Sequence, residues 1–176
     1  MRKLLSICTL QIFLALGTST AIATSGYRNE QVLDAPSGEL TGLEFENTSQ
    51  GKLRIAAQFV ELREGSAWSP CVFVGLRSSS REDQFRLFYM QHKKGDKDLI
   101  MGYEYSENGK NLKRTAIVTR IPKTEEIELE MEWAPSGEVH FKDALGRKQK
   151  FDTRLKSAIP FIQVCSAKAK VRWSIY

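Results

Sequence analysis

Three glutamates at alternate positions are the residues of this sequence best spaced for chemistry. They lie in Glu126-Ile127-Glu128-Leu129-Glu130, within an alternation of acidic and apolar residues that runs on to Trp133. Alternate side chains of a β-strand point to the same face, so the carboxylates would stand in one row. Two carboxylates about 5–5.5 Å apart can act as nucleophile and acid/base in the cleavage of a glycosidic bond.

The same row is also what a solvated strand face looks like, and we favour this second interpretation. The acidic positions continue unbroken to Glu132, and a later stretch supplies cations that could pair across strands, such as Lys168, Lys170 or Arg172. We therefore predict no catalytic residue in this chain. We also expect Glu128→Gln to leave any activity unchanged.

The element that carries the glutamates is predicted to be the first strand of a hairpin. Ala134-Pro135-Ser136-Gly137 has turn composition, and the alternation resumes at Val139 and Phe141. From Leu40 onward, short apolar or alternating runs follow one another, separated by turn signals, and no stretch shows a helical period with caps. About ten short strands at such spacing indicate a β-sandwich or barrel. We predict an all-β, two-sheet antiparallel β-sandwich.

Two of the predicted strands are apolar at both parities and should lie centrally. They are Cys71 to Leu76 and Phe85 to Met90. One face of such a strand packs on the core, and the other is covered or lines a groove. Arg86, Phe88 and Met90 share one face, which is a binding surface if open and a second core if covered.

Trp68 is the aromatic residue best placed for exposure. It lies in the polar segment Glu64-Gly65-Ser66-Ala67-Trp68-Ser69-Pro70. An exposed ring could stack on a sugar, whereas a buried one would anchor the loop under the sandwich. The candidate ligand-binding residues are therefore Trp68, Arg86, Phe88 and Met90.

The first residues have the composition of a secretory signal peptide. Arg2 and Lys3 precede an apolar run from Leu4 to Gly17, and Ala21-Ile22-Ala23 is a cleavage pattern. The run is shorter than the roughly 20 residues of a membrane span, so we expect no stable membrane insertion after cleavage. We expect residues 1–23 to be the leader, 24–39 an N-terminal arm or edge segment, and 40–176 one sandwich domain. The expected location is secreted or periplasmic.

Cleavage after Ala23 would leave Cys71 and Cys165, an even pair in an oxidising compartment. We predict a disulfide between them, the alternative being two separately buried thiols. His92 and His140 lie far apart without further ligands spaced for a metal, so we predict neither a metal site nor a cofactor.

The charge of the chain is mild and evenly spread. Without Arg2 and Lys3, 24 basic residues face 21 acidic ones, and the net charge falls from +5 to +3. Together with an extracytoplasmic location, this excludes nucleic acid as an expected partner. The charges are best interpreted as a solvated surface.

A series of features in the second half resembles a known superfamily. These are the strand Ile127–Trp133 with its terminal Trp, the turn Pro135-Ser136-Gly137, the return strand at 139–141, Gly146, and the segment Ile162–Ala169. In this order they resemble the concanavalin A-like jelly-roll superfamily, which includes laminin G-like modules, legume-type lectins and several glycosidases. The resemblance covers roughly residues 59–175. It implies two antiparallel sheets packed face to face, one of them curved into a shallow concave surface.

The resemblance also lets us rank the possible functions. Retaining glycosidases of the superfamily carry an acidic signature on a strand, but Glu128 stands here where they have Asp. We therefore expect an exported, non-catalytic module whose partner is a carbohydrate or glycoconjugate. The alternative is a periplasmic module that binds another extracytoplasmic protein, as inhibitors and immunity proteins do. A degenerate glycosidase-like enzyme is the third possibility.

Overall fold

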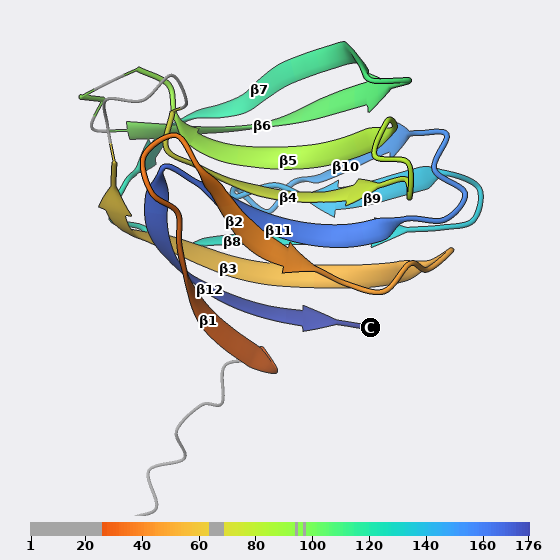
Figure 1. Ribbon diagram of the computed structural model, residues 1–176, viewed down its shortest axis with the longest axis horizontal. Coiled ribbons are helices and arrows are strands. Elements are labelled where there is room, and N and C mark those ends of the chain that lie inside the picture. Colours follow the sequence, from red (N-terminus) through yellow and green to blue (C-terminus); the bar gives the residue numbers. More distant parts are fainter. Residues whose placement is uncertain (1–25, 64–68, 94, 97) are drawn as a thin grey trace, which may run out of the picture.

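A computed structural model describes residues 26–63, 69–93, 95, 96 and 98–176, and these form two antiparallel β-sheets (Figure 1). Each sheet has six strands, and the described residues contain no helix. The predicted fold class, an all-β two-sheet antiparallel sandwich, is confirmed. Among the described residues there is accordingly no helix long and apolar enough to cross a membrane.

The first sheet, called sheet A below, carries the predicted glutamate strand near its middle. Its strand order is β1-β12-β3-β8-β9-β10. The bounds are β1 Asn29–Asp34, β12 Ala167–Ile175, β3 Gly51–Leu62, β8 Ile127–Trp133, β9 Glu138–Lys142 and β10 Lys148–Asp152.

The second sheet, sheet B, contains the two strands predicted to be central. Its order is β2-β11-β4-β5-β6-β7. All seven residues of β4 are buried, and the strand lies between β11 and β5. The bounds are β2 Leu40–Glu44, β11 Ile159–Cys165, β4 Cys71–Arg77, β5 Gln84–Gln91, β6 Asp98–Glu107 and β7 Lys110–Pro122.

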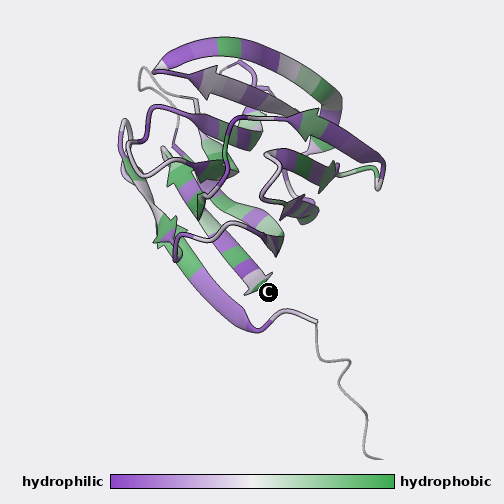
Figure 2. Cartoon of the chain, turned by 90° about the vertical axis from the view of Figure 1, so that its right-hand side faces the viewer, coloured by the Kyte–Doolittle hydropathy of each residue, from purple (hydrophilic) through white to green (hydrophobic). Residues whose placement is uncertain are grey.

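The main core fills the space between the sheets and follows the period of two. In β8, Ile127, Leu129 and Met131 are buried, while the alternating glutamates face outward. Tyr103 and Tyr105 of β6 are also buried in this core. Figure 2 shows the resulting alternation of hydrophobic and hydrophilic residues along the strands.

The predicted hairpin of β8 and β9 is present. Trp133 and Val139 are register partners on either side of the turn. Gly137 has a φ of +87°, a left-handed conformation that glycine adopts without strain. A Cβ at this position would also lie 2.3 Å from the carbonyl oxygen of Thr153. The turn therefore needs glycine on both counts.

The segment predicted as an arm or edge strand contains β1, which pairs with β12 along its whole length. Just before it, the ring of Tyr27 lies between the guanidinium groups of Arg54 and Arg172, at 4.8 and 5.0 Å from its centroid. These contacts dock the start of the described chain on the outer face of sheet A. The predicted leader, residues 1–23, lies outside the described residues.

Candidate functional site

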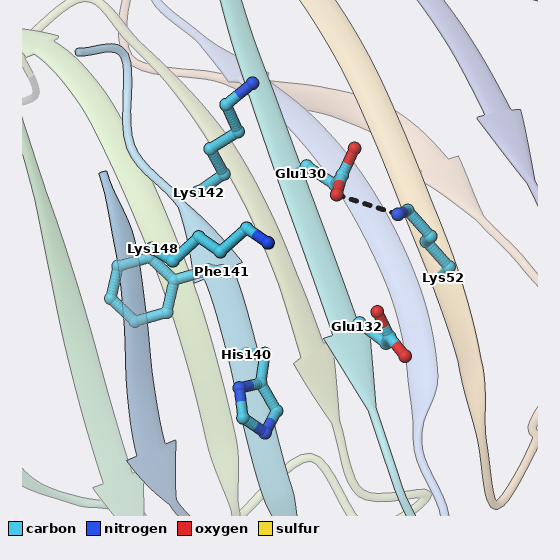
Figure 3. A pocket seen from close by; sticks show the side chains of 7 residues that line it. All are labelled: Lys52, Glu130, Glu132, His140, Phe141, Lys142 and Lys148. Atoms are coloured by element: carbon cyan, nitrogen blue, oxygen red, sulfur yellow. Dashed lines mark ion pairs between the residues drawn. The ribbon is translucent and has the colours of Figure 1, made fainter. Parts of the chain in front are cut away.

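The outer face of sheet A carries the glutamate row, and its carboxylates are paired with cations. Glu128 accepts from Arg54 at 3.1 Å, and Glu130 lies 2.7 Å from Lys52 (Figure 3). Glu126 pairs with Arg172. The interpretation of the row as a stripe paired across strands is thus confirmed by the geometry, and Arg172 was one of its predicted partners.

The other two predicted partners lie elsewhere. Lys168 lies 3.8 Å from Asp34 and Lys170 lies 3.1 Å from Glu30, both acids belonging to β1. The reason is strand order, because β3 separates β12 from β8 and β1 lies on the other side of β12. Of the three cations offered as alternatives, Arg172 is the one that pairs with the row in the described part of the chain.

The protonation of Glu128 does not fit an acid catalyst. Partial burial favours its neutral form, but hydrogen bonds from Arg54 and the nearby positive charges of Arg54 and Lys142 outweigh this and hold the pKa of the carboxyl below its usual value. A general acid at neutral pH needs the opposite shift. Glu128 is therefore an ionised structural partner.

A shallow hollow of about 300 Å³ lies on this face (Figure 3). The ring of Phe141, drawn at its edge, belongs to the buried core between the sheets. Apart from the imidazole of His140, the polar groups around the hollow are long charged side chains with freedom to move. The polar residues are Lys52, Glu130, Glu132, His140, Lys142 and Lys148.

The outer face of sheet B is built differently, with aromatic and small residues under a few charges. Across the sheet, Gly75, Arg86, Glu104 and Arg114 are successive register partners on β4, β5, β6 and β7. The neighbouring row contains Phe73, Phe88, Gly102 and Ala116, and the next contains Cys165, Cys71, Met90 and Ile100.

The aromatic rings of this face form a second, smaller hydrophobic cluster. Phe73, Phe88 and Phe161 are buried in it together with both cysteines. Two glycines leave space for the rings: a Cβ at Gly102 would lie 2.4 Å from Cζ of Phe88, and one at Gly75 would lie 2.6 Å from Cζ of Phe161. The rings therefore lie close against the sheet.

Charged side chains cover this aromatic layer. The guanidinium of Arg86 lies 4.0 Å from the ring centroid of Phe73, and that of Arg114 lies 5.1 Å from the centroid of Phe88. Glu104 links the two arginines, because its Oε1 accepts from Nη2 of Arg86 at 2.9 Å and its Oε2 lies 3.9 Å from Nε of Arg114. The side chain of Glu104 is only 11% exposed. The two arginines hold it in place.

A hollow of about 580 Å³, called the sheet B hollow below, opens over these residues. Arg86, Phe88 and Met90, which were predicted from one strand, all line it. Trp68 lies outside the described residues. The lining consists of Ser69, Cys71, Phe73, Arg86, Phe88, Met90, His92, Ile100, Glu104, Arg114 and Ala116.

The two alternatives for the Arg86 face both apply in part. Phe88 is 1% exposed and belongs to a covered second cluster, whereas the side chains of Arg86 and Arg114 are 21% and 53% exposed above it. Glu104 and Arg114 were not predicted as site residues. The signal for Glu104 was a lone acid in the middle of an apolar strand, between Tyr103 and Tyr105.

Cys71 and Cys165 are direct register partners on β4 and β11, and both are buried free thiols. The predicted disulfide is therefore not formed in the structure, although strand pairing has brought the two residues together. The thiols are in hydrogen-bond contact, which lowers the pKa of Cys165 to about 6 and, together with burial, raises the pKa of Cys71. Within the described residues, no group of three or more His, Cys, Asp or Glu side chains could hold a metal ion.

Comparisons with known proteins identify the architecture. No family model matches the sequence, and no curated protein is significantly similar to it. Galectin-Ib of Xenopus laevis superimposes with a TM-score of 0.54 at 13% identity, over 77% of this chain and 100% of the galectin.

Two further solved structures agree with this. A toad ovary galectin in complex with thio-digalactose gives a TM-score of 0.51 at 14% identity, over 78% of this chain and 96% of its own. The carbohydrate-binding module CBM66 from Bacillus subtilis gives 0.53 at 12% identity, over 81% and 88%. At these identities the likeness concerns the fold alone. The chain has the concanavalin A-like jelly-roll sandwich fold that these lectins and this binding module also have.

Proposed function

We propose that this protein is a carbohydrate-binding module and that the sheet B hollow is its binding site. The observation that carries the proposal is the row Arg86–Glu104–Arg114, which brings hydrogen-bond donors and an acceptor side by side inside a hollow. Among structures of the same fold are a galectin solved with thio-digalactose and a carbohydrate-binding module. These neighbours support the class of ligand.

The chemistry of the hollow suits a polyhydroxylated ring. Sugar hydroxyls can donate to the Glu104 carboxylate and accept from guanidinium groups, and hydrogen bonds to charged groups are the stronger kind. Met90 and Ile100 are partly buried and offer apolar contact to the C–H groups of a sugar. Phe73 and Phe88 are 6% and 1% exposed, so recognition rests on the charged row rather than on ring stacking.

Glycan-array binding by the purified protein tests this function, with Glu104→Gln as the site variant and Glu128→Gln as the matched control on sheet A. We expect binding to at least one glycan class. It should weaken tenfold or more in Glu104→Gln, a change of about 1.4 kcal/mol, and stay unchanged in Glu128→Gln. Absence of binding to every glycan, or equal loss in both variants, would overturn the proposal.

A protein-binding role, the alternative from the sequence, has less support. Such a role calls for a contiguous apolar patch. The large apolar side chains exposed among the described residues lie on different elements: Val32, Leu40, Val60, Leu112, Leu145 and Tyr176.

We further propose that the protein is exported and loses residues 1–23. The support is the leader composition and the Ala21-Ile22-Ala23 pattern. Gly26, three residues after the predicted cleavage site, already contacts the sandwich, because its carbonyl oxygen accepts a hydrogen bond from the Ser174 hydroxyl at 3.3 Å. N-terminal sequencing of the protein recovered outside the cytoplasm should begin at Thr24, and an uncleaved chain would contradict the proposal.

If the protein is exported, it enters an oxidising compartment, and we expect Cys71 and Cys165 to form a disulfide there. A thiol–disulfide oxidant could take two electrons and two protons from Cys71 and Cys165, which already face each other across the strand pair. Alkylation of the unfolded, exported protein without reductant should add no group, and reduction should then expose two. Uptake of two groups without reductant would show that the thiols stay free, as in the structure.

A further inference from the structure

We propose that the sheet B hollow selects an acidic sugar, a hexuronic acid unit, and that Arg114 is the residue that reads its carboxylate. This rests on the proposed function, because it specifies the ligand of the same site.

The lining of the hollow has a surplus of positive charge. Arg86 and Arg114 face the single carboxylate of Glu104 among the described lining residues. Glu104 is 11% exposed and lies closer to Arg86, at 2.9 Å, than to Arg114, at 3.9 Å. One guanidinium charge is therefore left without a close counter-ion.

Arg114 is the guanidinium with donors to spare. Its Nε is 3.9 Å from Glu104 Oε2, beyond hydrogen-bond distance, and its Nη2 lies 3.3 Å from the thioether sulfur of Met90, a weak acceptor. No oxygen of the described residues lies within hydrogen-bond distance of this group. With its side chain 53% exposed, Arg114 can present its planar donor pair to a carboxylate.

The residues around Arg114 further restrict the chemical class of the ligand. Glu104 needs donors from the ligand, which hydroxyl groups supply and a bare inorganic anion does not. Met90 and Ile100 provide an apolar wall next to the charges. A ligand with a carboxylate, hydroxyl groups and C–H faces on one ring satisfies all three, and a hexuronic acid has this composition.

Matched pairs of oligosaccharides that differ only in charge test the inference. The probes are oligomers of galacturonate, glucuronate and mannuronate, each beside its methyl ester, titrated calorimetrically into the purified protein. At least one acid should bind tenfold or more tighter than its ester, and the preference should shrink as salt is raised. A second measurement uses three variants. Arg114→Gln should bind acid and ester alike, Arg114→Lys should keep part of the preference, and Glu128→Gln should keep all of it.

The outcomes separate the two proposals. Equal affinity for acids and esters, or binding of neutral glycans alone, would overturn the acidic-sugar inference and leave the proposed function standing. A preference for acids that survives Arg114→Gln would also overturn the role of Arg114. Failure to bind any acid, ester or neutral glycan would overturn the proposed function itself.

Discussion

The outer faces of the two sheets show opposite ways of placing charge on a β-sandwich. On sheet A, the central pair of Arg54 and Glu128 stands in solvent, with side chains 36% and 53% exposed. On sheet B, Arg86 and Glu104 are 21% and 11% exposed and lie over a buried aromatic layer. The first arrangement keeps long side chains adjustable, and the second holds them in fixed positions.

The difference supports the proposed placement of the binding site on sheet B. Exposed pairs contribute little to stability and are screened by salt. A shielded pair is costly to desolvate and is retained where geometry matters. On sheet B, the glycines Gly75 and Gly102 leave the space in which Phe161 and Phe88 lie close to the sheet beneath the charges.

The largest effect is expected where the aromatic layer meets the sheet. In Gly102→Val, the new side chain would begin 2.1 Å from the carbonyl oxygen of Thr115 and 2.4 Å from Cζ of Phe88. We expect a loss of about 3 kcal/mol in the free energy of unfolding. Lys168→Val, on the outer face of sheet A, should change it by less than about 1 kcal/mol. Urea unfolding measures both, and equal losses would remove the distinction between the faces.

The next effect concerns the two ion pairs. Glu104→Gln leaves a half-buried arginine without its counter-charge and should cost about 1.5 kcal/mol of stability. Glu128→Gln should cost less than about 0.5 kcal/mol, because Arg54 remains solvated. Thermal or urea unfolding compares the two variants. A larger loss for Glu128→Gln would reverse our ranking of the pairs.

The smallest effect is the acid sensitivity of sheet A. Hydrogen bonds from Arg54 hold the pKa of Glu128 below its usual value despite partial burial. Since the folded pKa is the lower one, this stabilisation is present above the unfolded pKa of about 4.3 and is lost as pH falls through the folded value. Carboxyl-carbon NMR should place the midpoint of Glu128 below that of an unperturbed glutamate, and Arg54→Gln should raise it. A midpoint unaffected by Arg54→Gln would contradict the assigned cause.

The period of two was enough to predict the sandwich and the direction of most side chains. It predicted that Glu126–Trp133 forms a strand with one buried and one solvent-exposed face, which the structure confirms. It also placed Arg86, Phe88 and Met90 on one face, and all three line the same hollow. Periodicity contains no information on which strands are neighbours, however. The insertion of β12 between β1 and β3 directs Lys168 and Lys170 to β1.

A local irregularity in the β6–β7 pairing explains why Arg114 was not predicted as a neighbour of Glu104. Asn108-Gly109 closes the β6–β7 hairpin with positive φ at both positions, as Asn-Gly pairs commonly do in two-residue hairpin loops. The register then shifts between Tyr105 and Ser106, a bulge that skips one residue of β7. Because of this shift, Glu104 faces Arg114, where a regular ladder would have placed Lys113. A side-chain pattern does not reveal such a bulge.

The strand order also has a consequence for how the molecule folds. β11 lies between β2 and β4, and β12 lies between β1 and β3, so residues 159–175 occupy inner positions in both layers. Neither layer can be completed while this stretch is missing, so the early strands must wait for partners that are synthesised later. Assembly of this kind depends on pairing between distant parts of the chain and is slow.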